Sequence, residues 1–356
     1  MRRIFLCILF LACVVPVHAF QSGPEKRLSA KSVGVEIPVG IKESLWAQRI
    51  PKHNPLSKEK IALGRALYFD KRLSIDGTVS CATCHDPALA FTDGNVVAVG
   101  GRETRGTRNA PTLLNTVFNQ IFFWDGRART LEEQVKHPLL SSSEMGMTSE
   151  KALVARLESI PEYQKQFKRI FSADGLTIDT VAKAIAAYER TLLSGNSPFD
   201  RFIWGQRFAI SDAQKRGWDL FKGKARCSEC HTYSPENQFF TDFEFHNTGI
   251  AAGELGRFAV SRQPADTGAF KTPTLRDLEL TAPYMHDGSL KTLIDVVQFY
   301  NRGGNANRYL DKRMLPLQLT DVEVNDLVQF LRALTSDDVL RQCQSTTPQT
   351  RVPVPL

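Results

Sequence analysis

Two short segments of this sequence combine cysteine and histidine at a spacing that indicates a specific chemistry. Segment 81–85 reads CATCH, and segment 227–231 reads CSECH. Two cysteines at this spacing can form thioether bonds to the two vinyl groups of one haem, and the histidine that follows then lies beneath the iron. The sequence therefore predicts two covalently attached c-type haems, with the following attachment and ligand residues: Cys81, Cys84, His85, Cys227, Cys230 and His231.

Cysteines at this spacing have two other common functions. In an exported protein each pair can form a disulfide, and the four cysteines together can hold a zinc ion. Neither use requires a histidine directly after the second cysteine in both segments. One further cysteine of the predicted mature chain, Cys343, is given no role.

The segments that follow the two motifs resemble each other. NAPTLLN at 109–115 matches KTPTLRD at 271–277, and WDGRARTLEEQV at 124–135 matches HDGSLKTLIDVV at 286–297. The step from the shared proline to the shared aspartate has the same length in both copies. A repeat of this kind indicates one structural unit that occurs twice.

Hydrophobic periodicity predicts that most of the remaining chain is helical. Apolar residues recur every three or four positions at 150–158, 162–171 and 178–193, and capping boxes at Ser211 and Thr320 predict two further helix starts. We therefore expect a mostly α-helical protein that consists of two tandem cytochrome c-like haem domains from an internal duplication. The predicted parts are a signal peptide at 1–19, an N-terminal domain at 20–205, a C-terminal domain at 206–340 and a tail at 341–356.

The first residues have the form of a secretory signal peptide. Arg2 and Arg3 precede a short apolar run, and a small-residue cleavage site ends at Ala19. The run is too short for a comfortable membrane span. We expect a periplasmic protein that begins near Phe20 and has no membrane span. The formal net charge is +7, but no dense Lys/Arg tract occurs, so nucleic acid is not an expected partner.

The two copies differ at the position that is expected to supply the sixth ligand of the haem iron. Tyr300 follows Asp287 by the same number of positions as Pro138 follows Asp125, the matching aspartate of the first copy. A phenol can ligate haem iron, whereas proline has no donor side chain. We therefore expect Tyr300 to close the second iron, and the first iron to keep a site for a small oxidant.

Glu144 and Trp124 are candidates for the chemistry at the open iron. Glu144 follows shortly after Pro138, so the same loop can bring its carboxylate over the iron. Peroxide cleavage requires a group that takes a proton from one oxygen and delivers it to the other. Trp124 replaces the histidine of the second copy, His286, and could carry an electron between two redox centres. The alternatives are a solvent-exposed glutamate and an ordinary core tryptophan.

Taken together, these motifs resemble those of the bacterial dihaem cytochrome c peroxidases and their relative MauG, the methylamine utilisation protein. The likeness extends from about Leu45 to Leu334 and includes the sequences SCATCHDP, RNAPTLLN, FWDGRARTLEEQ, CSECH and FYNRGG. The resemblance implies that the first haem reacts with peroxide and that the second supplies electrons. It implies further site residues: Trp124 between the haems, Glu144 as distal acid–base group, Gln134 in the distal pocket, and Asn109, Thr281 and Pro283 around one calcium ion.

The sequence departs from the typical family patterns at three positions. Most dihaem peroxidases carry a blocking histidine in the loop after the first haem motif, at the position where this chain has Gly101, and a methionine where it has Tyr300. Both changes resemble MauG and imply a first iron that is open at rest. MauG has a tryptophan just before the second motif, where this chain has Ala225, which argues against the same protein substrate. His137 and His246 are spare candidate ligands, with a structural role as the alternative.

Three functions compete at this point. The first, which we favour, is a periplasmic peroxidase that reduces hydrogen peroxide to water with electrons from a small cytochrome or copper protein. The second is a MauG-like enzyme that oxidises residues of a partner protein through a high-valent haem pair. The third is a non-enzymatic electron carrier with two closed haems. Both a monomer and a homodimer are compatible with the resemblance.

Overall fold

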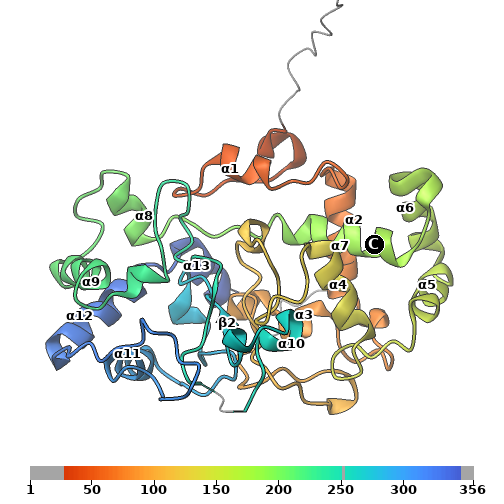
Figure 1. Ribbon diagram of the computed structural model, residues 1–356. Helices are drawn as coiled ribbons and strands as arrows, with labels where there is room; N and C mark the ends of the chain where they lie inside the picture. The colour runs from red at the N-terminus through yellow and green to blue at the C-terminus, as the bar shows by residue number, and fades with distance from the viewer. Residues whose placement is uncertain (1–27, 251–252, 346–356) are drawn as a thin grey trace, which may run out of the picture.

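A computed structural model describes residues 28–250 and 253–345 of the chain (Figure 1). The predicted signal peptide, residues 1–19, lies outside these residues. The described chain is mostly helical, as predicted, and its strands β1 (Phe245–His246) and β2 (Phe270–Lys271) form one short antiparallel pair. Within the same residues, no helix is both long enough and apolar enough to cross a membrane.

The helices form two groups, one at each end of the molecule in Figure 1. The first group, preceded by α1 (Glu43–Gln48), contains α2 (Lys58–Phe69), α3 (Cys81–Cys84), α4 (Leu131–Leu140), α5 (Glu150–Glu158), α6 (Pro161–Phe171) and α7 (Ile178–Glu189). The second group contains α8 (Pro198–Ile203), α9 (Asp212–Lys222), α11 (Leu293–Asn301) and α12 (Asp321–Arg332), while α10 (Phe258–Ser261) and α13 (Asp337–Ser345) lie between the two ends.

The helices predicted from periodicity are present as α5, α6 and α7, and the capping boxes at Ser211 and Thr320 are confirmed. Two boundaries differ: α6 begins one residue earlier than predicted, at Pro161, and α7 ends at Glu189 and not at 193. The residues after it turn away to bond with Asn115. The backbone N–H of Asn115 donates to the carbonyl of Leu192, and its side-chain carbonyl accepts from the N–H of Ser194.

A close helix crossing forms the centre of each group. Helix α2 crosses α7, and α9 crosses α12. A Cβ atom at Gly64 would lie 1.8 Å from the carbonyl oxygen of Ala184, and one at Gly217 would lie 2.0 Å from that of Asp326. No larger residue fits at either crossing without moving a helix. Each crossing is surrounded by its own cluster of buried apolar side chains.

Segments 109–131 and 271–293 adopt the same local structure at corresponding positions. Asn115 and Asp277 are both left-handed, with φ of 61° and 59°, and each is followed by a short 3-10 turn. Thr130 and Thr292 both cap the helix that follows, α4 and α11. The sequence likeness of the two segments is therefore accompanied by the same turns and helix starts.

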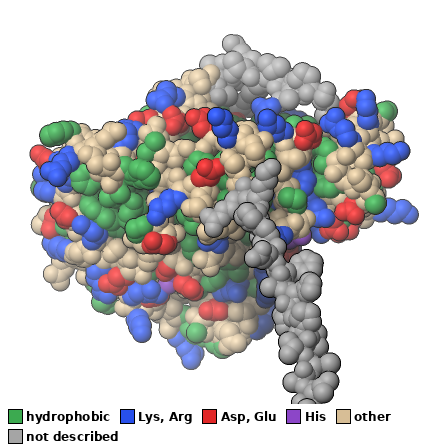
Figure 2. Space-filling model, turned by 90° about the horizontal axis from the view of Figure 1, so that it is seen from above, with side chains coloured by type: hydrophobic (Ala, Val, Ile, Leu, Met, Phe, Trp, Pro, Cys, Tyr) green, Lys and Arg blue, Asp and Glu red, His purple; other side chains and the backbone are tan. Residues whose placement is uncertain are grey.

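The surface seen from above carries Lys/Arg and Asp/Glu side chains in mixture (Figure 2). Hydrophobic side chains gather toward the end where α8 and α9 lie in Figure 1. The exposed apolar residues after α8 include Trp204, at 59% exposure, and Phe208, at 99%.

Candidate haem sites and the contact between them

The second CxxCH motif opens into a large cavity that also contains the predicted sixth ligand. Cys227, Cys230 and His231 line this cavity, and Tyr300 reaches it from α11. Tyr300 is distant from the motif in sequence, so its position in this cavity depends on the packing of α11. The structure therefore places Tyr300, the residue that differs between the two copies, in the same cavity as the second motif.

His231 is oriented for ligation by its backbone partner. Its Nδ1 lies 2.8 Å from the carbonyl oxygen of Phe240. Burial lowers the pKa of His231, so the imidazole is neutral, with the Nδ1 proton donated to that carbonyl. Such a bond fixes the tautomer and leaves Nε2 as the metal donor.

Tyr300 is a protonated phenol in the protein alone. Burial raises its pKa, and the thiols of Cys230 and Cys227 add to the effect. As a ligand to the second haem, Tyr300 would have to give up its phenolic proton, since a buried anion without a partner is unfavourable.

The first motif repeats the arrangement around its histidine. His85 Nδ1 lies 3.2 Å from the carbonyl oxygen of Phe91, and burial lowers the pKa of His85. The hydroxyl of Tyr68, on α2, donates to the backbone carbonyl of His85. Ala90 and Phe91 have φ of 51° and 59°, and this left-handed turn directs the Phe91 carbonyl toward the imidazole.

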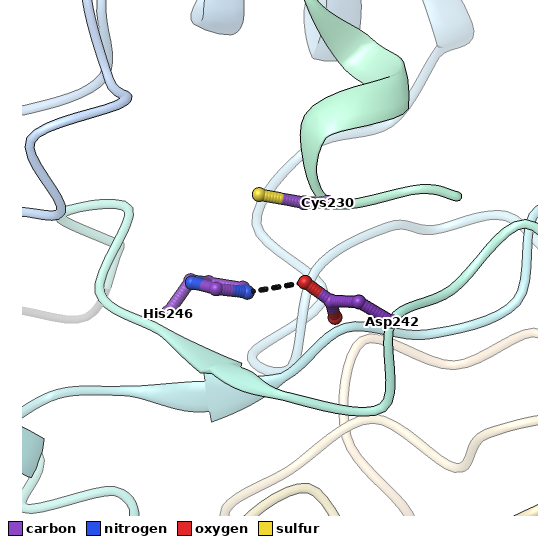
Figure 3. Close-up of side chains that lie close together, drawn as sticks. All are labelled: Cys230, Asp242 and His246. Atoms are coloured by element: carbon purple, nitrogen blue, oxygen red, sulfur yellow. Dashed lines mark hydrogen bonds and ion pairs between the residues drawn. The ribbon is translucent and has the colours of Figure 1, made fainter.

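The cysteines of both motifs are available for thioether bonds. All four are free thiols in the structure. The described part of the chain brings together one group of three metal-ligand side chains, Cys230, Asp242 and His246 (Figure 3), and this group contains no second cysteine. The four cysteines of the zinc alternative do not come together in such a group among the described residues. Free thiols beside neutral histidines fit covalent haem.

The group in Figure 3 is an ion-pair network beside Cys230. His246 Nε2 lies 2.9 Å from an Asp242 carboxylate oxygen, and Nδ1 lies 2.7 Å from one of Asp311. Burial opposes the imidazolium charge, but Asp242 and the neighbouring groups raise the pKa of His246 to about 10. With both nitrogens engaged by carboxylates, His246 fits a structural role better than that of a spare iron ligand.

Glu144 lies close to the first motif. Its charge acts on the thiols of Cys81 and Cys84, and its backbone carbonyl accepts a 2.6 Å hydrogen bond from the N–H of Gly101. Burial raises the pKa of Glu144, while Arg127, Ser141 and His137 act in the opposite direction. The carboxyl group is thus half-buried, at a distance from which its charge still influences the two cysteines.

The other residues predicted for the distal pocket come from α4. Gln134 and Pro138 are one helical turn apart on this helix, so they share a face. His137 is exposed, and its ring packs edge-on against Phe123 with centroids 5.4 Å apart.

Arg127 is a residue that sequence reasoning missed. Its guanidinium lies 3.4 Å from the centroid of the Phe123 ring, and its charge favours the carboxylate form of Glu144. The turn around the Phe122–Ala128 bridge places it there. Its place in the WDGR sequence, next but two to Trp124, marks Arg127 as a charged residue near a candidate site. The spacing of the sequence does not indicate that its charge acts on Glu144.

Trp124 lies at the contact between the two segments. Its indole Nε1–H donates to the carbonyl of Asn109 over 3.0 Å, and its ring lies 6.3 Å from that of His286. A reciprocal pair of backbone bonds joins the segments here: Asn109 N–H to the His286 carbonyl, and Lys271 N–H to the Trp124 carbonyl, each 2.8 Å.

The predicted calcium residues Asn109, Thr281 and Pro283 line the same cavity as the second motif. The side-chain amide of Asn109 donates to the carbonyl of Asn95 over 2.8 Å. Asn109 thus lines the same cavity as Thr281 and Pro283, from which it is distant in the chain.

Cys343, which had no predicted role, packs near the first motif. It lies on α13, and its thiol donates to the carbonyl of Pro87 over 3.8 Å. Gln342 donates to the same carbonyl over 3.2 Å. The C-terminal helix thereby holds the loop that follows His85.

The sequence is similar to known proteins over most of its length. Residues 58–207 match the family of di-haem cytochrome c peroxidases. The chain is 44% identical over 291 residues to the methylamine utilization protein MauG of Methylorubrum extorquens, covering 81% of each chain. It is 37% identical over 294 residues to the cytochrome c551 peroxidase of Nitrosomonas europaea, covering 82% of this chain and 84% of the relative.

The fold is similar to that of a solved structure, a MauG-like protein associated with microbial copper homeostasis. The TM-score is 0.74 at 33% sequence identity, covering 85% of this chain and 95% of the other. The sequence relatives are named as peroxidases and as MauG, both oxidoreductases. The resemblance noted from the motifs is confirmed, and the chain belongs to the family of di-haem cytochrome c peroxidases that includes MauG.

Proposed function

We propose that this protein reduces hydrogen peroxide to water at its first haem, with electrons that enter through its second haem from a small cytochrome or copper protein. Family membership implies two c-type haems. The different roles of the two haems are inferred from one difference between the copies. Tyr300 lines the cavity of the second motif, whereas the corresponding residue of the first copy is Pro138.

The residues of the chain have distinct parts in this reaction. The first haem, when bound, supplies the iron that exchanges electrons with peroxide. Glu144 accepts a proton from one peroxide oxygen and returns it to the other, from which water leaves. Arg127 favours the carboxylate that must accept the proton, against the effect of burial. Gln134, on the same helix as Pro138, orients the oxidant, and Trp124 is the group through which the electrons pass.

The tandem duplication and its domain boundaries are part of this proposal. We assign residues 20–205 to the peroxide-reactive domain and 206–340 to the electron-supplying domain. The matching turns of segments 109–131 and 271–293 support the duplication, as does the reciprocal pair of backbone bonds between them. Export to the periplasm rests on the N-terminal sequence, and a calcium ion at Asn109, Thr281 and Pro283 rests on the family resemblance and on their places in the lining of one cavity.

A second candidate function is MauG-like oxidation of a partner protein. The 44% identity to MauG favours it, as do Gly101 and Tyr300. Ala225 weighs against the same route to a protein substrate, because it is 3% exposed and offers no aromatic side chain. The third candidate, a simple electron carrier, is not favoured because the relatives are named as enzymes.

One experiment separates these functions. One equivalent of hydrogen peroxide is added to the fully ferric protein, and the visible and near-infrared spectra are recorded. A rapid reaction with a near-infrared band shared between the haems indicates MauG-like behaviour. A reaction that requires prior reduction of one haem indicates a reductively activated peroxidase. A spectrum that is unchanged in every redox state, with no peroxide consumed, would contradict both.

A further inference from the structure

Lys271 faces the cavity of the second motif from the strand that contacts Trp124. Its backbone N–H donates to the Trp124 carbonyl over 2.8 Å, and in the short sheet it pairs with Phe245. Its side chain lines the cavity together with Cys227 and Cys230. Lys271 therefore lies between the cavity of the second motif and Trp124.

The lysine and arginine residues that line this cavity differ in whether they form an ion pair. Three of them are paired with carboxylates at 2.7–2.8 Å: Arg226 with Glu229, Arg276 with Asp200 and Arg313 with Asp311. The ammonium group of Lys271 makes no hydrogen bond or ion pair with the residues that the structure describes. The charge of Asp242 favours it from a distance, but that carboxylate is bonded to His246.

An ammonium group in this position requires an anion. Burial lowers the pKa of Lys271 to about 8, which shows how poorly its surroundings replace water. A buried charge persists when it is paired and hydrogen-bonded. The anion must enter with the occupant of the cavity, since the carboxylates that pair with the other three cations are already engaged.

We propose that Lys271 forms an ion pair with a propionate carboxylate of the haem attached at Cys227 and Cys230. This inference rests on the attachment of the second haem but not on the peroxidase reaction. The corresponding residue of the first copy is Asn109, which is uncharged, so the ion pair distinguishes the two haems. Because the backbone N–H of Lys271 donates to the Trp124 carbonyl, the same residue would connect the haem to the segment that contains the tryptophan.

The test is a comparison of three variants of the two-haem protein by spectroelectrochemistry and resonance Raman spectroscopy. Lys271→Met removes the cation and should shift the ferric/ferrous equilibrium of the second haem toward ferric by about tenfold, or about 59 mV for a one-electron couple. Its propionate bending band should also shift. Lys271→Arg retains the charge and should preserve the potential. Lys312→Met removes an exposed lysine that does not line the cavity and should change neither property.

A potential and a propionate band that remain at wild-type values in Lys271→Met would overturn the proposal. If Lys271→Met does not retain its haem, the Raman band of Lys271→Arg decides, because a guanidinium in place of an ammonium must move it. In a Cys227→Ala/Cys230→Ala variant, the effect of Lys271→Met on the remaining haem should be absent, and its persistence would also contradict the assignment. Peroxide turnover is measured separately, so its absence would contradict the proposed function alone.

Discussion

The backbone N–H of Gly101 donates to the backbone carbonyl of Glu144 over 2.6 Å. This bond joins the loop that follows the first haem motif to the loop of the proposed acid–base residue. The preceding Gly100 makes the contact close, since a Cβ there would lie 2.3 Å from the carbonyl oxygen of Ser143. The position of Glu144 therefore depends on a glycine pair that is distant from it in sequence.

Gly100→Ala should disturb this contact. The added methyl group cannot be accommodated without a backbone shift, and overpacking of this kind costs about 1–3 kcal/mol. We expect a lower melting temperature and a slower reaction with peroxide. Gly106→Ala is the matched control, because its Cβ would meet the Ala98 carbonyl oxygen at 3.4 Å. Equal effects of the two substitutions would show that the loop contact has no special importance.

Glu144→Gln should slow peroxide cleavage by about 10²–10⁴-fold, the usual contribution of general acid–base catalysis. Stopped-flow spectroscopy of the ferric protein measures this rate, with Glu150→Gln, a change at an exposed residue, as control. A rate indistinguishable from that of the wild type would remove Glu144 from the mechanism.

The pH dependence of this reaction should reflect the raised pKa of Glu144. The carboxylate is the form that accepts a proton, so the rate should rise with pH, with an inflection above the ordinary value of 4.5 because burial raises the pKa. Arg127→Gln should move the inflection to still higher pH, because the arginine favours the carboxylate. An inflection that stays in place in this variant would show that Arg127 does not act on Glu144.

Tyr300→Phe should open the second iron. The aromatic ring is retained, but the donor oxygen is lost, so the cyanide stoichiometry of the ferric protein should rise from one to two per chain. Tyr309→Phe is the control, since Tyr309 does not line the cavity. Binding of a single cyanide by Tyr300→Phe would indicate that another group ligates the second iron.

Glu189→Gln should alter the pH dependence of stability. Glu189 is 3% exposed, one of its carboxylate oxygens has no hydrogen-bond partner, and burial raises its pKa to about 8. The neutral acid is the form that the folded state tolerates. Its contribution to stability is therefore complete below about pH 4.5, the ordinary value, and is lost as pH rises toward 8.

In Glu189→Gln this loss should be absent, so the melting temperature between pH 5 and pH 9 should fall less than in the wild type, as scanning calorimetry can measure. Glu158→Gln, at an exposed position, is the control. Identical pH profiles for wild type and Glu189→Gln would show that the acid is not strained in the folded protein.

The local features of this protein followed from the sequence alone. A CxxCH motif and a capping box each need residues that are close together in the chain, so both are readable without a fold. The difference between Tyr300 and Pro138 was also visible, because the repeat supplies an internal alignment. Even so, the end of α7 was misplaced, since Asn115, which is distant in sequence, competes for the backbone there.

The tertiary structure alone decided the contacts between distant segments. The bond from Trp124 to Asn109 and the Arg127–Phe123 stack arise from turns that bring particular side chains together. The tertiary structure also decides that Lys271 has no ion-pair partner among the described residues. The carboxylates near this cavity form ion pairs with other cations, such as Arg276 and Arg313. Pairing between charges is settled by distance and burial, and these follow from the packing of the whole chain.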